Sequence, residues 1–122
     1  MILRMFISIV MFFSTMSNAH GAVVIGGIDK EQLINGVMID TINSVTESQK
    51  VDHPEMETPV VKAWVKVTGE EITDEPRVVV MIDVTVWHQD EYGVVYIADQ
   101  FTIKKKLDLF EAKMYSSMSS QP

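Results

Sequence analysis

The sequence predicts an α+β domain: one N-terminal helix packed on a three- to four-stranded antiparallel sheet, with a short C-terminal helix. Three observations predict this class. Apolar residues recur at helical spacing over residues 34–45, three segments between residues 61 and 104 alternate with a period of two, and helical spacing returns after residue 106. Because short turns join the three alternating segments, their strands should pair in an antiparallel sheet.

The first 19 residues match a secretion signal. Arg4 precedes a short apolar stretch, and Ser17-Asn18-Ala19 provides small residues at the positions that a signal peptidase reads. The apolar run from Met5 to Met16 is shorter than the roughly 20 residues of a membrane-spanning helix. We therefore expect cleavage after Ala19, export to a bacterial periplasm, and a single domain over residues 20–122 with no membrane span.

Composition excludes several classes of function. Removal of residues 1–19 takes away one basic side chain, Arg4, and no acidic one, which leaves 9 basic and 17 acidic side chains and a net charge of −8. Nucleic acid is an unfavourable partner at that charge. The chain has no cysteine, so it has no disulfides, no thiol chemistry and no cysteine-built metal site. It also has no P-loop, nucleophile elbow or glycine fingerprint after a strand, so we expect neither an enzyme nor a cofactor.

The first predicted elements are a short arm or edge strand at residues 20–27 and the long helix. Asp29 is suited to cap the helix, with Gln32 completing a box-like pair. One helical stripe follows and ends near Glu47; it consists of Ile34, Val37, Met38, Thr41, Ile42 and Val45. Gly36 costs about 1 kcal/mol relative to alanine within a helix; a packing partner that approaches closely there would explain its presence, and a glycine that is merely tolerated would explain it equally well.

A polar loop at residues 49–59 leads to the three strands. In the first, Val61, Ala63, Val65 and Val67 alternate with Lys62, Trp64 and Lys66. The second, Arg77 to His88, has an unbroken apolar face and a mixed one, as expected of a central strand. In the third, Val94 to Lys104, the alternation predicts one face with Val95, Ile97, Phe101 and Ile103 and the other with Tyr96, Gln100 and Thr102.

Past the third strand, the spacing of Leu107, Phe110, Met114 and Met118 predicts a short, frayed helix. Lys104, Lys105 and Lys106 mark the end of the strand, where charge discourages pairing with another chain.

Two sets of residues are candidates for binding a partner. Trp64, Trp87 and Tyr96 are aromatic residues on an otherwise polar sheet face, and such residues are enriched at contact surfaces. The loop 69–76 holds Glu70, Glu71, Asp74 and Glu75. It lacks the ligand spacing of a calcium loop, so it is either a solvated hairpin tip or a negative surface for a basic partner.

A copper site is an alternative. Cleavage after Ala19 would leave His20 as the first residue, and an N-terminal histidine can bind Cu(II) through its amine and its ring. A second histidine would complete such a site, and His53 and His88 are the candidates. A polar residue that merely follows the cleavage position is the simpler interpretation.

Over residues 24–104 the order of features resembles the periplasmic accessory protein family of curli secretion. Ile28-Asp29 and Gly36 have that family's spacing, Asp74-Glu75-Pro76 resembles its acid–proline turn, and Val94-Val95-Tyr96 with Gln100-Phe101 resembles its last strand. The family's aromatic pair on the helix is replaced by Ile39-Asp40. The resemblance implies a non-enzymatic, chaperone-like protein of curli-type fibre assembly, which binds an exported client or an outer-membrane secretion channel.

One further hypothesis comes from the fold class. A helix across an antiparallel sheet is also the arrangement of cystatin-like protease inhibitors, and Gly26-Gly27 could match their N-terminal glycine. Their glutamine-valine-glycine hairpin has no counterpart, because the acidic loop stands in its place. The sequence leaves homo-oligomerisation and the identity of the client open.

Overall fold

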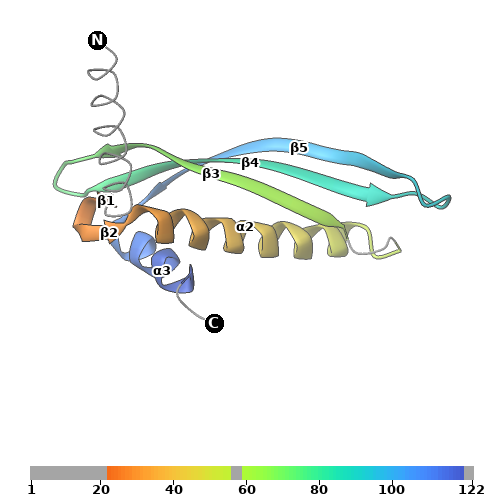
Figure 1. Cartoon of the computed structure of the whole chain (residues 1–122), viewed down its shortest axis with the longest axis horizontal. Helices are drawn as coiled ribbons and strands as arrows, with labels where there is room; N and C mark the ends of the chain where they lie inside the picture. Colours follow the sequence, from red (N-terminus) through yellow and green to blue (C-terminus); the bar gives the residue numbers. More distant parts are fainter. Residues whose placement is uncertain (1–21, 56–58, 120–122) are drawn as a thin grey trace, which may run out of the picture.

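The structure, a computed structural model, describes residues 22–55 and 59–119 and has the predicted α+β class (Figure 1). The predicted secretion signal and His20 lie outside the described residues. In chain order the elements are β1 (Val23–Val24), the 3-10 turn η2 (Ile25–Gly27), β2 (Ile28–Asp29), α2 (Lys30–Asp52), β3 (Val60–Glu71), β4 (Arg77–Gln89), β5 (Val95–Leu107) and α3 (Leu109–Ser119).

The long helix α2 begins at the predicted cap. The Asp29 carboxylate accepts a hydrogen bond from the backbone N–H of Gln32 at 3.0 Å, which satisfies one of the free donors of the first turn. The Gln32 side chain does not return the bond to Asp29 but accepts one from the Ser116 hydroxyl. The helix continues to Asp52, one turn beyond the predicted end near Glu47.

The face of α2 toward the sheet follows the predicted stripe except at its start. Ile34, the first predicted residue, is half-buried and does not belong to the core cluster. Val37 and Thr41 are buried, and Met38, Ile42 and Val45 pack against the core. Leu33, which the predicted stripe omits, is fully buried. It lies one turn before Val37 on the same face, so the stripe begins one residue earlier than predicted.

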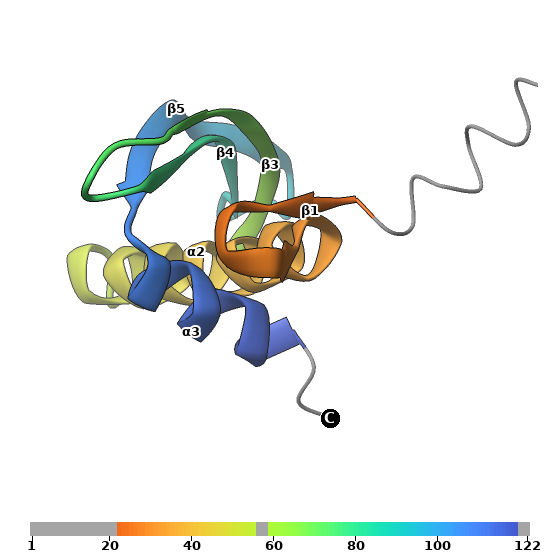
Figure 2. The ribbon, with the colours of Figure 1, turned by 90° about the vertical axis from the view of Figure 1, so that its left-hand side faces the viewer.

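The three long strands form one antiparallel sheet in the order β3-β4-β5. The predicted central position of the second strand is confirmed. Its alternate residues Val78, Val80, Ile82, Val84 and Val86 are buried against the helix. We call the side that contacts α2 the inner face and the opposite side the outer face; Figure 2 shows the sheet curving over α2.

The C-terminal helix α3 packs against α2 on the side away from the sheet (Figures 1 and 2). Its Ala112 and Tyr115 are buried. At the crossing, a Cβ added to Gly36 would overlap the backbone carbonyl of Tyr115. The predicted close approach at Gly36 is therefore confirmed, and the partner is α3.

The predicted N-terminal arm is a miniature antiparallel hairpin, in which Val23 pairs with Asp29 and Val24 with Ile28. Gly26 and Gly27 form its turn with φ of 71° and 72°, a left-handed conformation that glycine adopts at little cost. The Glu70 carboxylate accepts a hydrogen bond from the backbone N–H of Ile25 at 2.7 Å. This bond fastens the hairpin to the end of β3.

One prediction about the third strand is wrong. Val86 pairs with Asp99 while Trp87 pairs with Ile97, so Ala98 is an extra residue in β5. Such a β-bulge shifts the alternation by one residue. Phe101 and Ile103 therefore lie on the inner face as predicted, but Val95 and Ile97 lie on the outer face and Tyr96 on the inner face, opposite His88.

Candidate partner-binding surface

The outer face of the sheet is organised in rows, because residues opposite one another on neighbouring strands share a face. We call the end of the sheet at the β3–β4 turn proximal and the end at the β4–β5 turn distal. From proximal to distal, four rows run Lys66–Met81–Lys104, Trp64–Asp83–Thr102, Lys62–Thr85–Gln100 and Val60–Trp87–Ile97. Val95, beside Gln89, follows the last row.

The distal rows expose apolar side chains. We define the distal apolar patch as Val60, Trp87, Val95 and Ile97. Trp87 is half-buried and the other three are exposed. Val60, Lys62, Trp87 and Val95 line a shallow hollow on this face, and the Lys62 ammonium lies 5.7 Å from the centre of the Trp87 ring, within the range of a cation–π contact.

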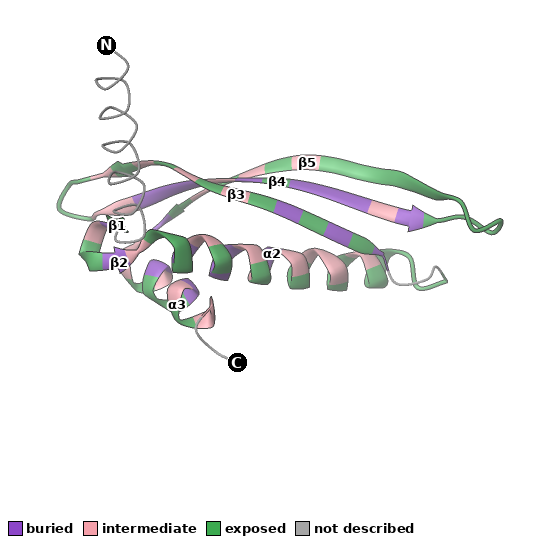
Figure 3. Cartoon of the chain, in the orientation of Figure 1, coloured by how far each residue is buried: buried purple, intermediate pink, exposed green. Residues whose placement is uncertain are grey.

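The first half of β5 is open on both faces. Figure 3 shows β4 buried along most of its length while the distal part of β5 is exposed, and every residue from Glu91 to Gln100 is exposed. In the described chain no strand pairs with the edge of β5 that points away from β4. Three successive apolar residues, Val95, Tyr96 and Ile97, therefore lie on a strand whose edge and two faces are free.

Trp64 and Trp87 share the outer face, as predicted. Trp64 is 56% exposed and lies beside Asp83, two rows from Trp87. Tyr96 does not belong with them, because the bulge at Ala98 turns its side chain to the inner face. There its ring lies 6.4 Å from the His88 ring.

The acidic loop is separate from the aromatic residues. β3 is 12 residues long, so at roughly 3.3 Å per residue Val60 and Glu71 lie roughly 36 Å apart. Three of the four carboxylates already have partners: Glu70 accepts from Ile25, Glu71 pairs with Lys106 at 2.7 Å, and Glu75 pairs with Arg77 at 3.3 Å. Asp74 is exposed. The predicted binding residues thus do not form one site.

Glu71 is held in its charged form. The hydrogen bond from Lys106, reinforced by the positive charge of the same ammonium, lowers the pKa of Glu71 from its ordinary value of 4.5. The pair lies at the proximal end of the outer face, where it is exposed to solvent.

A small polar cluster lies between β4 and the end of α2 at the distal end of the inner face. His88 is only 5% exposed, and its Nε2 donates to the side-chain oxygen of Gln49 at 2.9 Å. The centre of the His53 ring lies 5.5 Å from the centre of the His88 ring, in an edge-to-face arrangement. Nδ1 of His88 has no hydrogen-bond partner among the described residues. Because α2 extends to Asp52, its last turns reach this end of the sheet.

The described residues hold no group of three or more histidine, cysteine, aspartate or glutamate side chains that could bind a metal ion. Of the three histidines in the copper hypothesis, the structure places His53 and His88, while His20 lies outside the described residues. Within residues 22–55 and 59–119, no helix has the length and apolarity needed to cross a bilayer.

The face change at Ala98 is what sequence reasoning missed. It adds Val95 and Ile97 to the outer face beside Trp87 and removes Tyr96 from it, while Val60 joins them because β3 begins one residue before the predicted Val61. The apolar run 94–97 does not show which face each of its side chains occupies, because periodicity alone does not reveal a bulge. Comparison of the chain with family models, with curated proteins and with solved structures gives no match.

Proposed function

We propose that this chain is a non-enzymatic accessory protein that binds an exported, extended polypeptide through the distal end of its sheet. The observation that carries the proposal is the open first half of β5, where Val95, Tyr96 and Ile97 are exposed on a strand that pairs with β4 along one edge only. Extended polypeptides add to such an edge by backbone hydrogen bonds, while side-chain contacts supply specificity. The distal apolar patch lies next to that edge and supplies apolar contacts.

The setting of this activity is part of the proposal. The resemblance over residues 24–104 favours secretion and assembly of curli-type fibres, with a fibre subunit or an outer-membrane channel as the partner. The signal-like residues 1–19 favour the periplasm. Subunits of such fibres must stay unpaired until export, and a protein that occupies their edges would delay assembly.

The test uses fibre formation by a curli-type subunit, followed by dye fluorescence. The purified protein should lengthen the lag phase. Replacement of Ile97 by lysine should abolish much of this effect, because a charge on the patch opposes apolar contact and edge pairing. Ile97 is 53% exposed, so the variant should fold.

Ile72→Lys is the matched control. Ile72 is 79% exposed in the β3–β4 turn, at the other end of the sheet, and its replacement makes the same chemical change. It should leave the delay intact. An unchanged lag phase at several-fold molar excess of the protein, or equal loss in the two variants, would contradict the proposal.

A further inference from the structure

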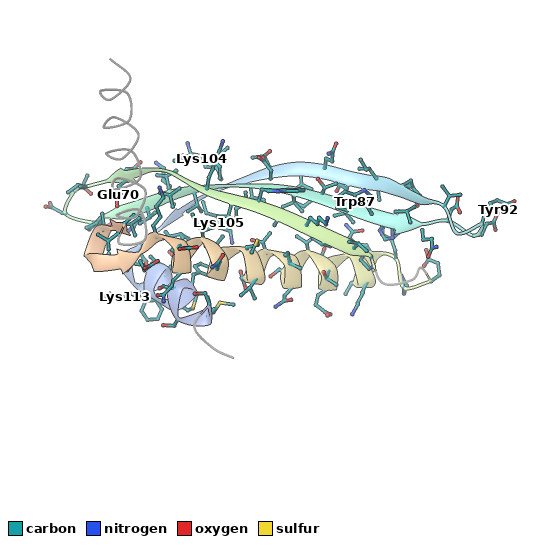
Figure 4. The ribbon with its side chains drawn as sticks, viewed as in Figure 1. Glu70, Trp87, Tyr92, Lys104, Lys105 and Lys113 are labelled. Carbon is teal, nitrogen blue, oxygen red and sulfur yellow. The ribbon has the colours of Figure 1, made fainter. Side chains whose placement is uncertain are left out.

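The outer face of the sheet carries a charge opposite to that of the whole chain. The chain has a net charge of −7, yet Lys62, Lys66, Lys104 and Lys106 all lie on this face. The face also carries the carboxylates of Glu71 and Asp83. Figure 4 shows Lys104 on the outer side of the sheet and Lys105 on the inner side, where Lys105 lies over the Tyr115 ring.

The two lysines of the row Lys66–Met81–Lys104 form no ion pair within the described chain, although the charge of Lys104 contributes to the lowered pKa of Glu71. Lys106 pairs with Glu71, and the Asp83 carboxylate accepts a hydrogen bond from the Thr102 hydroxyl. Lys66 and Lys104 flank Met81 in their row. Two like charges in one row repel each other, so a negative group placed between or beside them would be attracted.

The charged row and the apolar patch stand at a fixed separation. Three row steps of two residues each separate Lys66–Met81–Lys104 from Val60–Trp87–Ile97. At roughly 3.3 Å per residue, this separation is roughly 20 Å. An added strand beside β5 would have its outward side chains next to Lys104 at one end and next to Ile97 at the other.

We propose that the segment bound beside β5 is an extended polypeptide with acidic residues toward one end and apolar residues toward the other. Its carboxylates lie beside Lys104 and within the field of Lys66 two strands further away, and its apolar side chains lie beside Val95 and Ile97, the part of the distal apolar patch on β5. This inference rests on the proposed function and defines the chemistry of its client. Charge complementarity selects the client and fixes its direction along the edge, as charges do at protein interfaces.

The test uses three synthetic peptides of equal length and a titration of tryptophan fluorescence, since Trp87 lies beside Ile97 next to the proposed footprint. One peptide alternates glutamate with threonine in its first half and valine with threonine in its second half. The other two replace every glutamate by glutamine or by lysine. The glutamate peptide should bind about fivefold more tightly than the glutamine peptide at low salt, the combined effect of the charges of Lys104 and Lys66, and the lysine peptide more weakly still.

A double variant, Lys66→Gln with Lys104→Gln, should remove the preference for glutamate while leaving the glutamine peptide bound. The matched control is Lys30→Gln with Lys113→Gln. It removes two exposed lysines from α2 and α3, away from the outer face, as Figure 4 shows for Lys113. The control should keep the preference for glutamate. Added salt should weaken binding of the glutamate peptide more in the control, which keeps Lys66 and Lys104, than in the double variant.

Equal affinity for the three peptides, or equal loss of preference in both double variants, overturns this inference. If the protein still delays fibre formation in that case, the proposed function stands and only the acidic client is excluded. If the protein neither prefers the glutamate peptide nor delays fibre formation, both proposals fail. Binding to phosphatidylglycerol vesicles without any peptide binding also overturns the inference, since the same lysines would then serve a lipid surface.

Discussion

At the proximal end of the outer face, Glu71 and Lys106 form an exposed ion pair that makes the stability of the fold depend on pH. The hydrogen bond and the charge of Lys106 lower the pKa of Glu71 in the folded protein. A carboxyl group with a lowered folded pKa contributes stability above its unfolded pKa. That contribution is lost as the pH falls through the folded value.

The variant Glu71→Gln should therefore be less stable than the wild type at neutral pH, and the two proteins should converge as the pH falls well below 4.5. Urea denaturation at a series of pH values measures the difference. Because the pair is exposed, salt should reduce it. Glu91→Gln, in the β4–β5 turn, is the control and should track the wild type. A gap between wild type and Glu71→Gln that is constant with pH would show that the ion pair is not its origin.

At the scale of elements, the packing of α3 on α2 depends on a single glycine. A Cβ at position 36 would overlap the Tyr115 carbonyl, and a helix backbone cannot yield as a flexible side chain can. Gly36→Ala gains about 1 kcal/mol of helix propensity, but overpacking of this kind costs up to about 3 kcal/mol or more. We expect a net loss of about 2 kcal/mol, or a fall in melting temperature of at least about 8 °C.

Gly69→Ala is the control for that substitution. An added Cβ at position 69 has no neighbour within 4 Å, so its stability should stay within about 0.5 kcal/mol of the wild type. Thermal unfolding followed by circular dichroism compares the two variants. A Gly36→Ala protein as stable as the wild type would mean that the helices separate there without cost.

The elements themselves could be predicted from the sequence to a large extent. Asp29 as helix cap, Gly36 as a close contact and β4 as the central strand all follow from local chemistry and periodicity. The ends of elements were less accurate, since α2 extends five residues past Glu47 and β5 continues through the three lysines to Leu107. Tertiary packing determines where such elements end. For example, the hydrogen bond between Gln49 and His88 joins the last turns of α2 to the distal end of the sheet.

The candidate site was harder to predict than the elements. A period of two assigns faces correctly only while pairing is regular, and Ala98 interrupts it. Nothing in the composition of residues 95–100 marks the extra residue. For this reason a strict period of two puts Tyr96 on the wrong face and does not show that Val95 and Ile97 are neighbours of Trp87 on the outer face.

The whole molecule is asymmetric along the sheet. The proximal end is closed by the N-terminal hairpin, by α3 and by the bond between Glu70 and Ile25. The distal end has the last turns of α2 on one side and an open strand on the other (Figures 1 and 3). The proximal end thus supplies stability, and the distal end presents the apolar surface and unpaired edge on which the proposed binding mode rests.

Hydrogen exchange of the β5 backbone, with and without a curli-type subunit, tests most directly the proposal that a client binds at the distal end of the sheet and not at the proximal end. If a client adds as a strand beside β5, amides within residues 95–100 should exchange more slowly when it is bound, while those of α2 and α3 should not change. An unchanged rate in residues 95–100 under conditions where the subunit is bound, or protection confined to the proximal turn 72–76, would contradict the proposed mode of binding.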